Sequence, residues 1–319
     1  PLLGGVLVRV ADSHIRVGTF EYAAALKDKE LLKILLDYTV ERHYPHIAHE
    51  NDKALAFLTE VIKKQTDLIV HWMRVGFIHG VMNTDNIAIS GETIDYGPCA
   101  FMDSYNSDTV FSSIDHLGRY AFGNQPLILQ WNLARLAETL LPLLDNKSEN
   151  ALLKAEEALQ TFNYVYKEKR TDMMRHKLGL SGEQNEDETL IADLLDWMQQ
   201  TAADYTNTFR DLCSVEMPSN NQYQDGVFRA WHKRWRQRLE KNSKPLIVSQ
   251  KIMRETNPAI IPRNHKVQQV LEAAEGGDLK PLEELLSALK NPYHDQKALK
   301  LYQTPPMPSE RIRQTFCGT

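Results

Sequence analysis

Residues 79–97 read "HGVMNTDNIAISGETIDYG" and hold several side chains that are able to bind a cation. Asn83, Asp85, Asn86 and Asp95 carry side-chain oxygens, which are the ligands that Mg²⁺ prefers in proteins. The runs "IAIS" and "TIDYG", separated by a Ser-Gly-Glu turn, predict a small β-hairpin. Because a hairpin holds its two ends close together, we expect Asn86 and Asp95 to bind one cation between them.

The spacing within this stretch partly matches the catalytic loop of protein kinases, H-x-D-x-x-x-x-N, which a DFG segment follows. Asn86 lies seven residues after His79, as the pattern requires, and "DYG" at residues 95–97 stands in the place of DFG. Val81 occupies the position of the catalytic Asp, and its side chain cannot accept a proton from an attacking hydroxyl. The nearest carboxylate is that of Asp85, so the sequence predicts a metal site whose catalytic base is lost or has moved.

The rest of the chain predicts a mainly α protein with a small β portion. Residues 1–18 read as two short β segments about a polar turn, and Thr19 opens a helix that Pro45 stops. A second helix ends at Gly76, since glycine is a common residue at helix C-termini. After a polar loop, apolar periodicity predicts further helices over about 127–144, 150–180, 187–213 and 224–241, and two short helices between 257 and 290.

Composition argues against several functional classes. The chain has 319 residues and a net charge of −5, so no basic face for nucleic acid is expected. No apolar run approaches the roughly 18 residues that a membrane-spanning helix needs. Three scattered cysteines are too few for a disulfide framework and indicate a reducing compartment, which favours a cytoplasmic protein of bacterial type. The chain starts without Met and without the composition of a signal or transit peptide, so we expect a fragment or a processed form. A targeting signal upstream of residue 1 is compatible with this expectation.

Four long motifs carry a resemblance to a known family. They are "GVLVRVADSHIRVGTFEY", "GFIHGVMNTDNIAISGETIDYGPCAFMD", "LGRYAFGNQP" and "IIPRNH", and Cys317 stands third from the end. Together they closely resemble the selenoprotein O family of atypical protein kinase-like enzymes. The resemblance implies the C-lobe of a protein kinase-like fold with extra C-terminal helices. It divides the chain into the end of the N-lobe strands and the hinge at 1–18, a C-lobe with the catalytic loop and metal site at 19–150, and a helical extension with a tail at 151–319.

The same resemblance implies adenylyl transfer, in which AMP passes from a reversed ATP to a Ser, Thr or Tyr hydroxyl of a protein and pyrophosphate leaves. Position by position, Asp85 resembles the base, and Asn86 and Asp95 resemble the ligands of Mg²⁺ or Mn²⁺. Arg9 and Arg16 resemble contacts to the ATP phosphates, and Asp95 also takes part in nucleotide binding. Arginine suits that role because its planar fork binds phosphate oxygens bidentately.

The family pattern also has parts that this sequence does not show. A glycine-rich loop, a phosphate-binding Lys and its partner Glu are expected to precede residue 1, so the isolated fragment is expected to be inactive. Cys317 matches the family's terminal selenocysteine or cysteine. As a hypothesis it is an exposed thiol that is able to pair with Cys99 or with a partner under oxidation, and an ordinary free cysteine is the alternative.

Two other functions stay open from the sequence. A phosphotransferase of kinase-like fold is one, because the pattern in residues 79–97 also resembles aminoglycoside-kinase loops, although Val81 argues against it. A non-catalytic nucleotide-binding pseudokinase is the other, and it is favoured if Asp85 is unable to reach a substrate. Without the resemblance, Arg9 and Arg16 read as solvated strand residues.

Two further patterns favour structural roles. The three histidines of "HYPHIAHE", residues 43–50, have the spacing of zinc ligands, but Pro45 breaks the helix that would align them. We therefore expect a solvated loop. Trp231 and Trp235 are four residues apart with basic residues between them, which predicts a helix face packed on the core, supported by cation–π contacts, before any nucleic-acid role.

Overall fold

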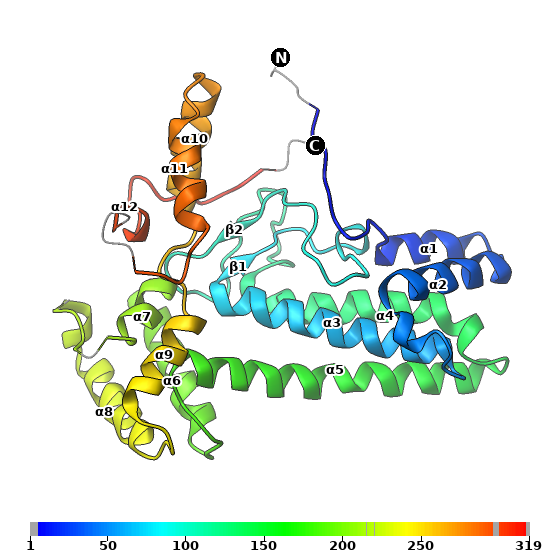
Figure 1. Cartoon of the computed structure of the whole chain (residues 1–319), viewed down its shortest axis with the longest axis horizontal. Helices are drawn as coiled ribbons and strands as arrows, with labels where there is room; N and C mark the ends of the chain where they lie inside the picture. The colour runs from blue at the N-terminus through cyan, green and yellow to red at the C-terminus, as the bar shows by residue number, and fades with distance from the viewer. Residues whose placement is uncertain (1–5, 215, 220, 296–299, 317–319) are drawn as a thin grey trace. The chain divides into compact units, whose positions relative to one another are not determined.

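The computed structural model is mainly helical, with a small β-sheet (Figure 1), which confirms the mainly α fold class. No helix in the part of the chain that it describes is long and apolar enough to cross a membrane. The division of the chain at residues 18 and 150 stays a prediction. The described residues are 6–214, 216–219, 221–295 and 300–316. Contacts define two compact units: unit 1 is Pro1–Ile69, Val81–Tyr96 and Pro126–Tyr166, and unit 2 is Val70–Gly80, Gly97–Gln125 and Lys167–Thr319.

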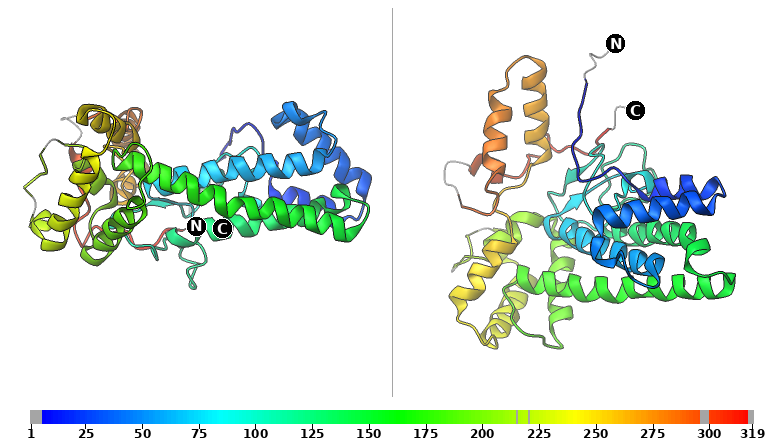
Figure 2. Two further views of the ribbon diagram at one scale, coloured as in Figure 1. Left: turned by 90° about the horizontal axis from the view of Figure 1, so that it is seen from below. Right: turned by 45° about the vertical axis from the view of Figure 1, so that its right-hand side comes forward.

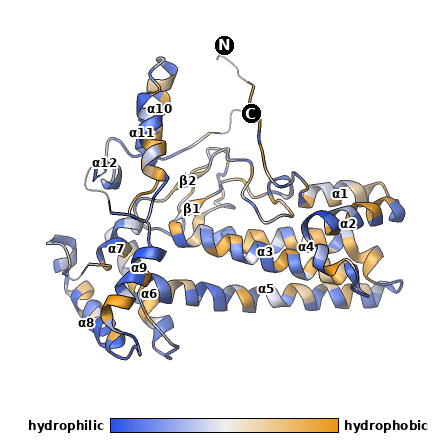
Figure 3. Ribbon diagram, viewed as in Figure 1, coloured by the Kyte–Doolittle hydropathy of each residue, from blue (hydrophilic) through white to orange (hydrophobic). Residues whose placement is uncertain are grey.

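Unit 1 is built from helices whose apolar sides face one another. The long helices run alongside one another (Figures 1 and 2), and hydrophobic and hydrophilic residues alternate along them (Figure 3). The unit contains α1 (Val17–Ala25), α2 (Lys29–His43), η1 (Pro45–Ile47), most of α3 (Lys53–Val75), η2 (Thr84–Asn86), α4 (Gln125–Leu144) and the first part of α5 (Ser148–Lys177). Its buried core includes Phe57, Leu58, Val61, Leu133, Leu136 and Leu140.

The single helix expected over residues 19–45 is two helices, α1 and α2, so that prediction is wrong. Lys27 adopts a left-handed backbone conformation with φ of 57°, which a regular helix cannot contain. The Asp28 side chain then accepts hydrogen bonds from the backbone N–H groups of Glu30 (3.0 Å) and Leu31 (3.1 Å). This cap starts α2 as a new helix.

The two β segments expected within residues 1–18 are also wrong for the described part. Residues 6–15 form no helix or β-bridge and bend at Asp12, and the next residue, Arg16, forms an isolated bridge with Ala88. The hairpin predicted after Asn86 is reduced to one bridge, between Ile87 and Thr93. Apolar and β-branched residues favour extended backbone, but a strand also needs a hydrogen-bonded neighbour along its length.

Unit 2 contains the sheet and the remaining helices. The strands β1 (Phe77–Ile78) and β2 (Ala100–Phe101) pair antiparallel, and two residues each are too few to give a periodic signal in the sequence. As predicted, α3 ends just before Gly76, whose φ is 72°. The further helices are η3 (Phe122–Asn124), α6 (Asp187–Thr201), α7 (Tyr205–Asp211), η4 (Asn221–Gln224), α8 (Gly226–Glu240), α9 (Leu246–Thr256), α10 (Asn264–Glu275), α11 (Lys280–Leu289) and α12 (Lys300–Gln303).

The helix expected over residues 187–213 is divided into α6 and α7. Ala202 has a left-handed φ of 51°, and the Asp204 side chain accepts a hydrogen bond from the N–H of Asn207 (2.8 Å), so a new cap starts α7. The helices expected near 150–180 and 224–241, and the two short helices before residue 290, are confirmed as α5, α8, α10 and α11. One further helix, α9, was not predicted from the sequence, and it starts directly after Pro245.

Trp231 and Trp235 pack in the core of unit 2, as predicted. Both are buried, and their rings stack with centroids 5.9 Å apart. Their indole N–H groups donate to the carbonyl oxygens of Leu190 (2.8 Å) and Leu178 (2.9 Å). These contacts account for the two tryptophans as structural residues.

Asp187, at the start of α6, is a fully buried carboxylate in unit 2. Burial raises the pKa of Asp187, but hydrogen bonds from Arg238, the N–H of Gln184 and Arg175 outweigh that effect and hold the pKa below its ordinary value. The distances are 2.7 Å from Arg238 Nε and 2.9 Å from Arg175 Nε. The lowered pKa means that this network stabilises the fold above the unfolded-state pKa, and that the contribution is lost as the pH falls through the folded-state pKa.

We expect Asp187→Ala to destabilise unit 2 by about 3–5 kcal/mol, because two arginines lose their buried partner. Urea unfolding followed by tryptophan fluorescence measures this change. The control is Asp193→Ala, which breaks a more exposed ion pair with Arg234 (2.8 Å) and is expected to cost at most about 1 kcal/mol. Equal stability losses in the two variants would contradict the stabilising role of the buried Asp187 network.

Candidate metal and nucleotide site

The backbone of unit 1 brings the predicted site residues together through three short pairings. Val17 N–H donates to Ile87 O (3.0 Å), and Ile89 N–H donates to Ile15 O (2.9 Å). These bonds fix the segment that carries Arg16 beside residues 87–89. The antiparallel bridge between Ile87 and Thr93 then turns the chain back, so that residue 86 and residues 94–95 lie at the same end of the turn.

Asn86 is oriented by its own side-chain amide. Its Nδ2 donates to the carbonyl oxygen of Val81 (2.8 Å), and its backbone N–H donates to Asn83 O (3.0 Å). Because the amide nitrogen is bound to Val81 O, the oxygen Oδ1 is the atom that remains for a cation. Val81 thus contributes its backbone where a kinase would use a side chain.

Asp95 has a left-handed backbone, with φ of 57°. Such a conformation is uncommon for residues other than glycine, and it is found most often in Asn and Asp, often at functional sites. Two guanidinium groups face the Asp95 carboxylate: Arg9 Nη1 contacts Oδ1, and Arg16 Nη2 lies 3.5 Å from Oδ2. The structure therefore places three of the predicted residues in one cluster.

Arg16 also carries a polar atom without a protein partner. Its Nε is buried and forms no hydrogen bond in the described structure. A buried donor of this kind costs free energy unless something satisfies it. An anionic oxygen is the natural acceptor for a guanidinium N–H, so the observation fits a phosphate.

Asp85 lies in η2 against the first turn of α1. Its backbone N–H donates to Asn83 Oδ1 (3.0 Å), which caps η2, and the residue is exposed to solvent. Gly18 makes room for the carboxylate, because a Cβ at residue 18 would lie 2.3 Å from Asp85 Oδ1. The carboxylate is therefore accessible, and it lies where residue 18 has no Cβ.

Three residues that the sequence analysis missed hold this segment from its other side. Gln65 Nε2 donates to Ala88 O (2.6 Å), Tyr44 Oη to Ile89 O (2.6 Å), and Asn132 Nδ2 to Met82 O (2.9 Å). All three side chains are buried. For Gln65 on α3 and Asn132 on α4, a polar residue on the apolar side of a helix was the available signal, since such groups must bind a nearby backbone group.

Other predicted features lie elsewhere. His79 is buried in unit 2, where its ring stacks on Trp72 with centroids 5.3 Å apart. Cys99 is a half-buried free thiol, whereas Cys317 lies outside the described residues, so the tether between them stays a prediction. Of the three clustered histidines, His46 approaches Glu60 (3.4 Å), and the described residues contain no group of three or more His, Cys, Asp or Glu that suits a metal.

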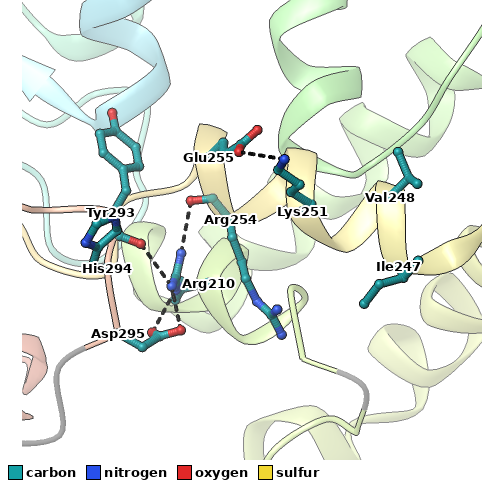
Figure 4. A pocket seen from close by; sticks show the side chains of 9 residues that line it. All are labelled: Arg210, Ile247, Val248, Lys251, Arg254, Glu255, Tyr293, His294 and Asp295. Carbon is teal, nitrogen blue, oxygen red and sulfur yellow. Dashed lines mark hydrogen bonds and ion pairs between the residues drawn. The ribbon is translucent and has the colours of Figure 1, made fainter.

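A pocket of about 650 Å³ in unit 2 contains none of the predicted site residues (Figure 4). Arg210 occupies its centre and donates to the carbonyl oxygens of Arg254 (3.1 Å), Asn257 (3.0 Å) and Tyr293 (3.2 Å). It also pairs with Asp295, 2.7 Å away. Because its N–H groups are used within the protein, Arg210 joins α7 and α9 to residues 293–295 and serves the fold.

We expect Gly18→Ala to lower catalysis by roughly 10²-fold, because the added methyl displaces the Asp85 carboxylate. Stability is expected to stay equal or to rise by up to about 1 kcal/mol, since Ala is the better helix former. Turnover and the unfolding midpoint measure the two effects. Gly226→Ala at the start of α8 is the matched control, because a Cβ there meets no atom within 4 Å. Equal activity in both variants would contradict the role of Gly18.

Comparison with known proteins gives a family model and relatives that match most or all of this chain. The family model described as "Protein adenylyltransferase SelO" matches residues 2–290. Proteins named "Protein nucleotidyltransferase YdiU" are 56% identical over 319 residues in Alcanivorax borkumensis and 55% identical over 319 residues in Nitrosococcus oceani. These matches cover 100% of this chain but 66% and 65% of those proteins, so the chain spans just under two thirds of their length. Because the family model matches most of its residues, the chain belongs to the SelO family.

Proposed function

We propose that this protein is a protein adenylyltransferase, which moves AMP from ATP to Ser, Thr or Tyr hydroxyls of other proteins. The observation that carries the proposal is the cluster of Arg9, Arg16 and Asp95, with Asp85 and Asn86 on the adjoining turn. The names of the family and of its relatives support the same chemistry. The kinase-like C-lobe, the three-part division of the chain and a cytoplasmic location belong to this proposal and rest on the resemblance.

The residues fit a divalent metal. Asn86 offers its amide oxygen, because its nitrogen is bound to Val81 O, and Asp95 offers a carboxylate. Oxygen donors of this kind suit Mg²⁺ or Mn²⁺. A bound metal would neutralise phosphate charge in the transition state.

Arg9 and Arg16 are proposed to contact the phosphates of ATP. Their guanidinium groups face Asp95, and an incoming triphosphate would offer them stronger partners, which would leave the Asp95 carboxylate able to hold a metal. The Nε of Arg16 has no hydrogen-bond partner, so it can donate to a phosphate oxygen without breaking an existing bond. These positive groups stabilise negative charge that develops as pyrophosphate leaves.

Asp85 is proposed to act as the general base. It accepts the proton of the acceptor hydroxyl while the hydroxyl oxygen bonds to the α-phosphorus. The bond between the α-phosphorus and the oxygen that bridges to the β-phosphate breaks, and pyrophosphate carries away that electron pair. Gly18 has no Cβ and therefore leaves room for the carboxylate at this position.

Intact mass spectrometry tests the proposal. The full-length protein is incubated with ATP, Mg²⁺ and a candidate acceptor protein, and the mass gained by the acceptor is measured. A gain of one AMP supports adenylyl transfer, and a gain of one phosphate overturns it in favour of a kinase.

A further inference from the structure

Five large apolar side chains are exposed on the helix pair α1–α2. Exposed hydrophobic side chains that gather on one surface mark interaction sites more often than chance would give. Both helices carry hydrophobic residues along their length (Figure 3). The five residues, here called the α1–α2 patch, are Tyr22, Leu26, Leu31, Ile34 and Tyr38, and they are between 38% and 71% exposed.

The helical positions of these residues place them away from the core. Leu31, Ile34 and Tyr38 are three and four residues apart, so they lie along one face of α2. The buried residues Leu32 and Leu36 lie on the opposite face. Tyr22 on α1 and Leu26, which directly follows α1, are likewise four residues apart, and the turn at residues 26–27 puts Leu26 and Leu31 at the same end of the helix pair.

The patch adjoins Asp85 at one point and the segment that carries Arg9 and Arg16 at another. Gly18, in the first turn of α1, touches the Asp85 carboxylate, and Tyr22 follows one helical turn later, about 6 Å along the axis. At the other side, Arg42 donates through Nη1 to Tyr38 Oη (3.2 Å) and through Nε to Asp12 O (3.1 Å). Asp12 belongs to the segment that carries the two arginines of the site.

We propose that the α1–α2 patch binds the acceptor protein through apolar side chains close to the hydroxyl that receives AMP. This inference rests on the proposed function. A protein substrate must lie against Asp85, and the surface that leaves Asp85 along α1 is apolar. An extended peptide advances about 3.3 Å per residue, so the apolar residues of the acceptor stand roughly two to four positions from the modified residue.

Two synthetic peptide pools of equal charge test the proposal. Each peptide has a single acceptor, Ser, Thr or Tyr, and the positions two to four residues on either side carry Leu, Ile and Phe in one pool and Ser, Gln and Gly in the other. Fluorescence anisotropy measures binding to the full-length Asp95→Ala protein, which needs no catalysis. The apolar pool is expected to bind about tenfold more tightly, because two or three apolar side chains leave water.

Ile34→Lys, added to the same protein, is expected to remove this preference. The matched control is Leu153→Lys on α5, because Leu153 is also exposed and both new lysines have a glutamate four residues before them. In an otherwise unchanged enzyme, Ile34→Lys is expected to raise KM for the apolar pool about tenfold at unchanged kcat.

Equal binding of the two pools would overturn the proposal that the patch binds the acceptor protein. Equal losses of affinity for the apolar pool in Ile34→Lys and Leu153→Lys would overturn it as well. An Ile34→Lys protein that changes from dimer to monomer without any change in peptide binding would also overturn it, in favour of self-association. If the protein prefers the apolar pool but the unmodified enzyme transfers no AMP, peptide binding by the patch is supported and adenylyl transfer is rejected.

Discussion

Replacing Asp95 by Ala in the full-length protein is expected to lower AMP transfer by at least about 10³-fold and to leave the fold intact. Asp95 is the proposed carboxylate ligand of the metal, and it also receives Arg9 and Arg16. Its side chain is only partly buried, so the loss of these ion pairs costs little stability. Alanine in the left-handed conformation costs roughly 1–2 kcal/mol.

Two measurements separate chemistry from folding in this variant. Circular dichroism and the unfolding midpoint report the fold, and electron paramagnetic resonance with Mn²⁺ and a non-hydrolysable ATP analogue reports metal binding. Asp95→Asn is the control for shape, because asparagine tolerates the same backbone conformation and lacks the charge. Full activity of either variant at saturating Mg²⁺ would exclude Asp95 as a ligand.

Asp85→Ala is expected to lower transfer by about 10²–10⁴-fold, with KM for ATP unchanged, because a general base acts on the acceptor hydroxyl and not on nucleotide binding. Asp85→Asn distinguishes a general base from a side chain that only orients the loop. Asparagine keeps the size that fits against Gly18 but cannot accept the proton. An active Asp85→Asn enzyme would show that Asp85 only orients the loop.

The residue types of the candidate site could be predicted because they depend on spacing along a short segment. Asn86 and Asp95 follow His79 at the distances of a kinase-like loop, and the structure brings Asp95 together with Arg9 and Arg16. The backbone around them could not be predicted from periodicity. It depends on single bridges and on side chains from distant helices, such as Gln65, which have no fixed spacing to the loop.

The helix boundaries show the same limit of local patterns. Leucine and isoleucine recur at three- and four-residue steps within residues 26–36, and no Pro or Gly interrupts residues 19–44, so the pattern predicts one helix. Lys27 nevertheless takes a left-handed conformation, which a lysine at this position does not predict. Asp28 was the available signal, because an aspartate followed by an acidic residue in the first turn is typical of a helix start. The exposed face of α2 depends on this break, since α2 folds back on α1 after it.

The position of the transferred label tests the central claim most directly. Val81 leaves no polar side chain where a kinase orients the hydroxyl beside the γ-phosphate, so γ-transfer is expected to be slow. The full-length enzyme, given Mg²⁺ and an acceptor protein, is therefore expected to label that protein from α-³²P-ATP and not from γ-³²P-ATP. Label that arrives from the γ-position would contradict adenylyl transfer and identify a kinase.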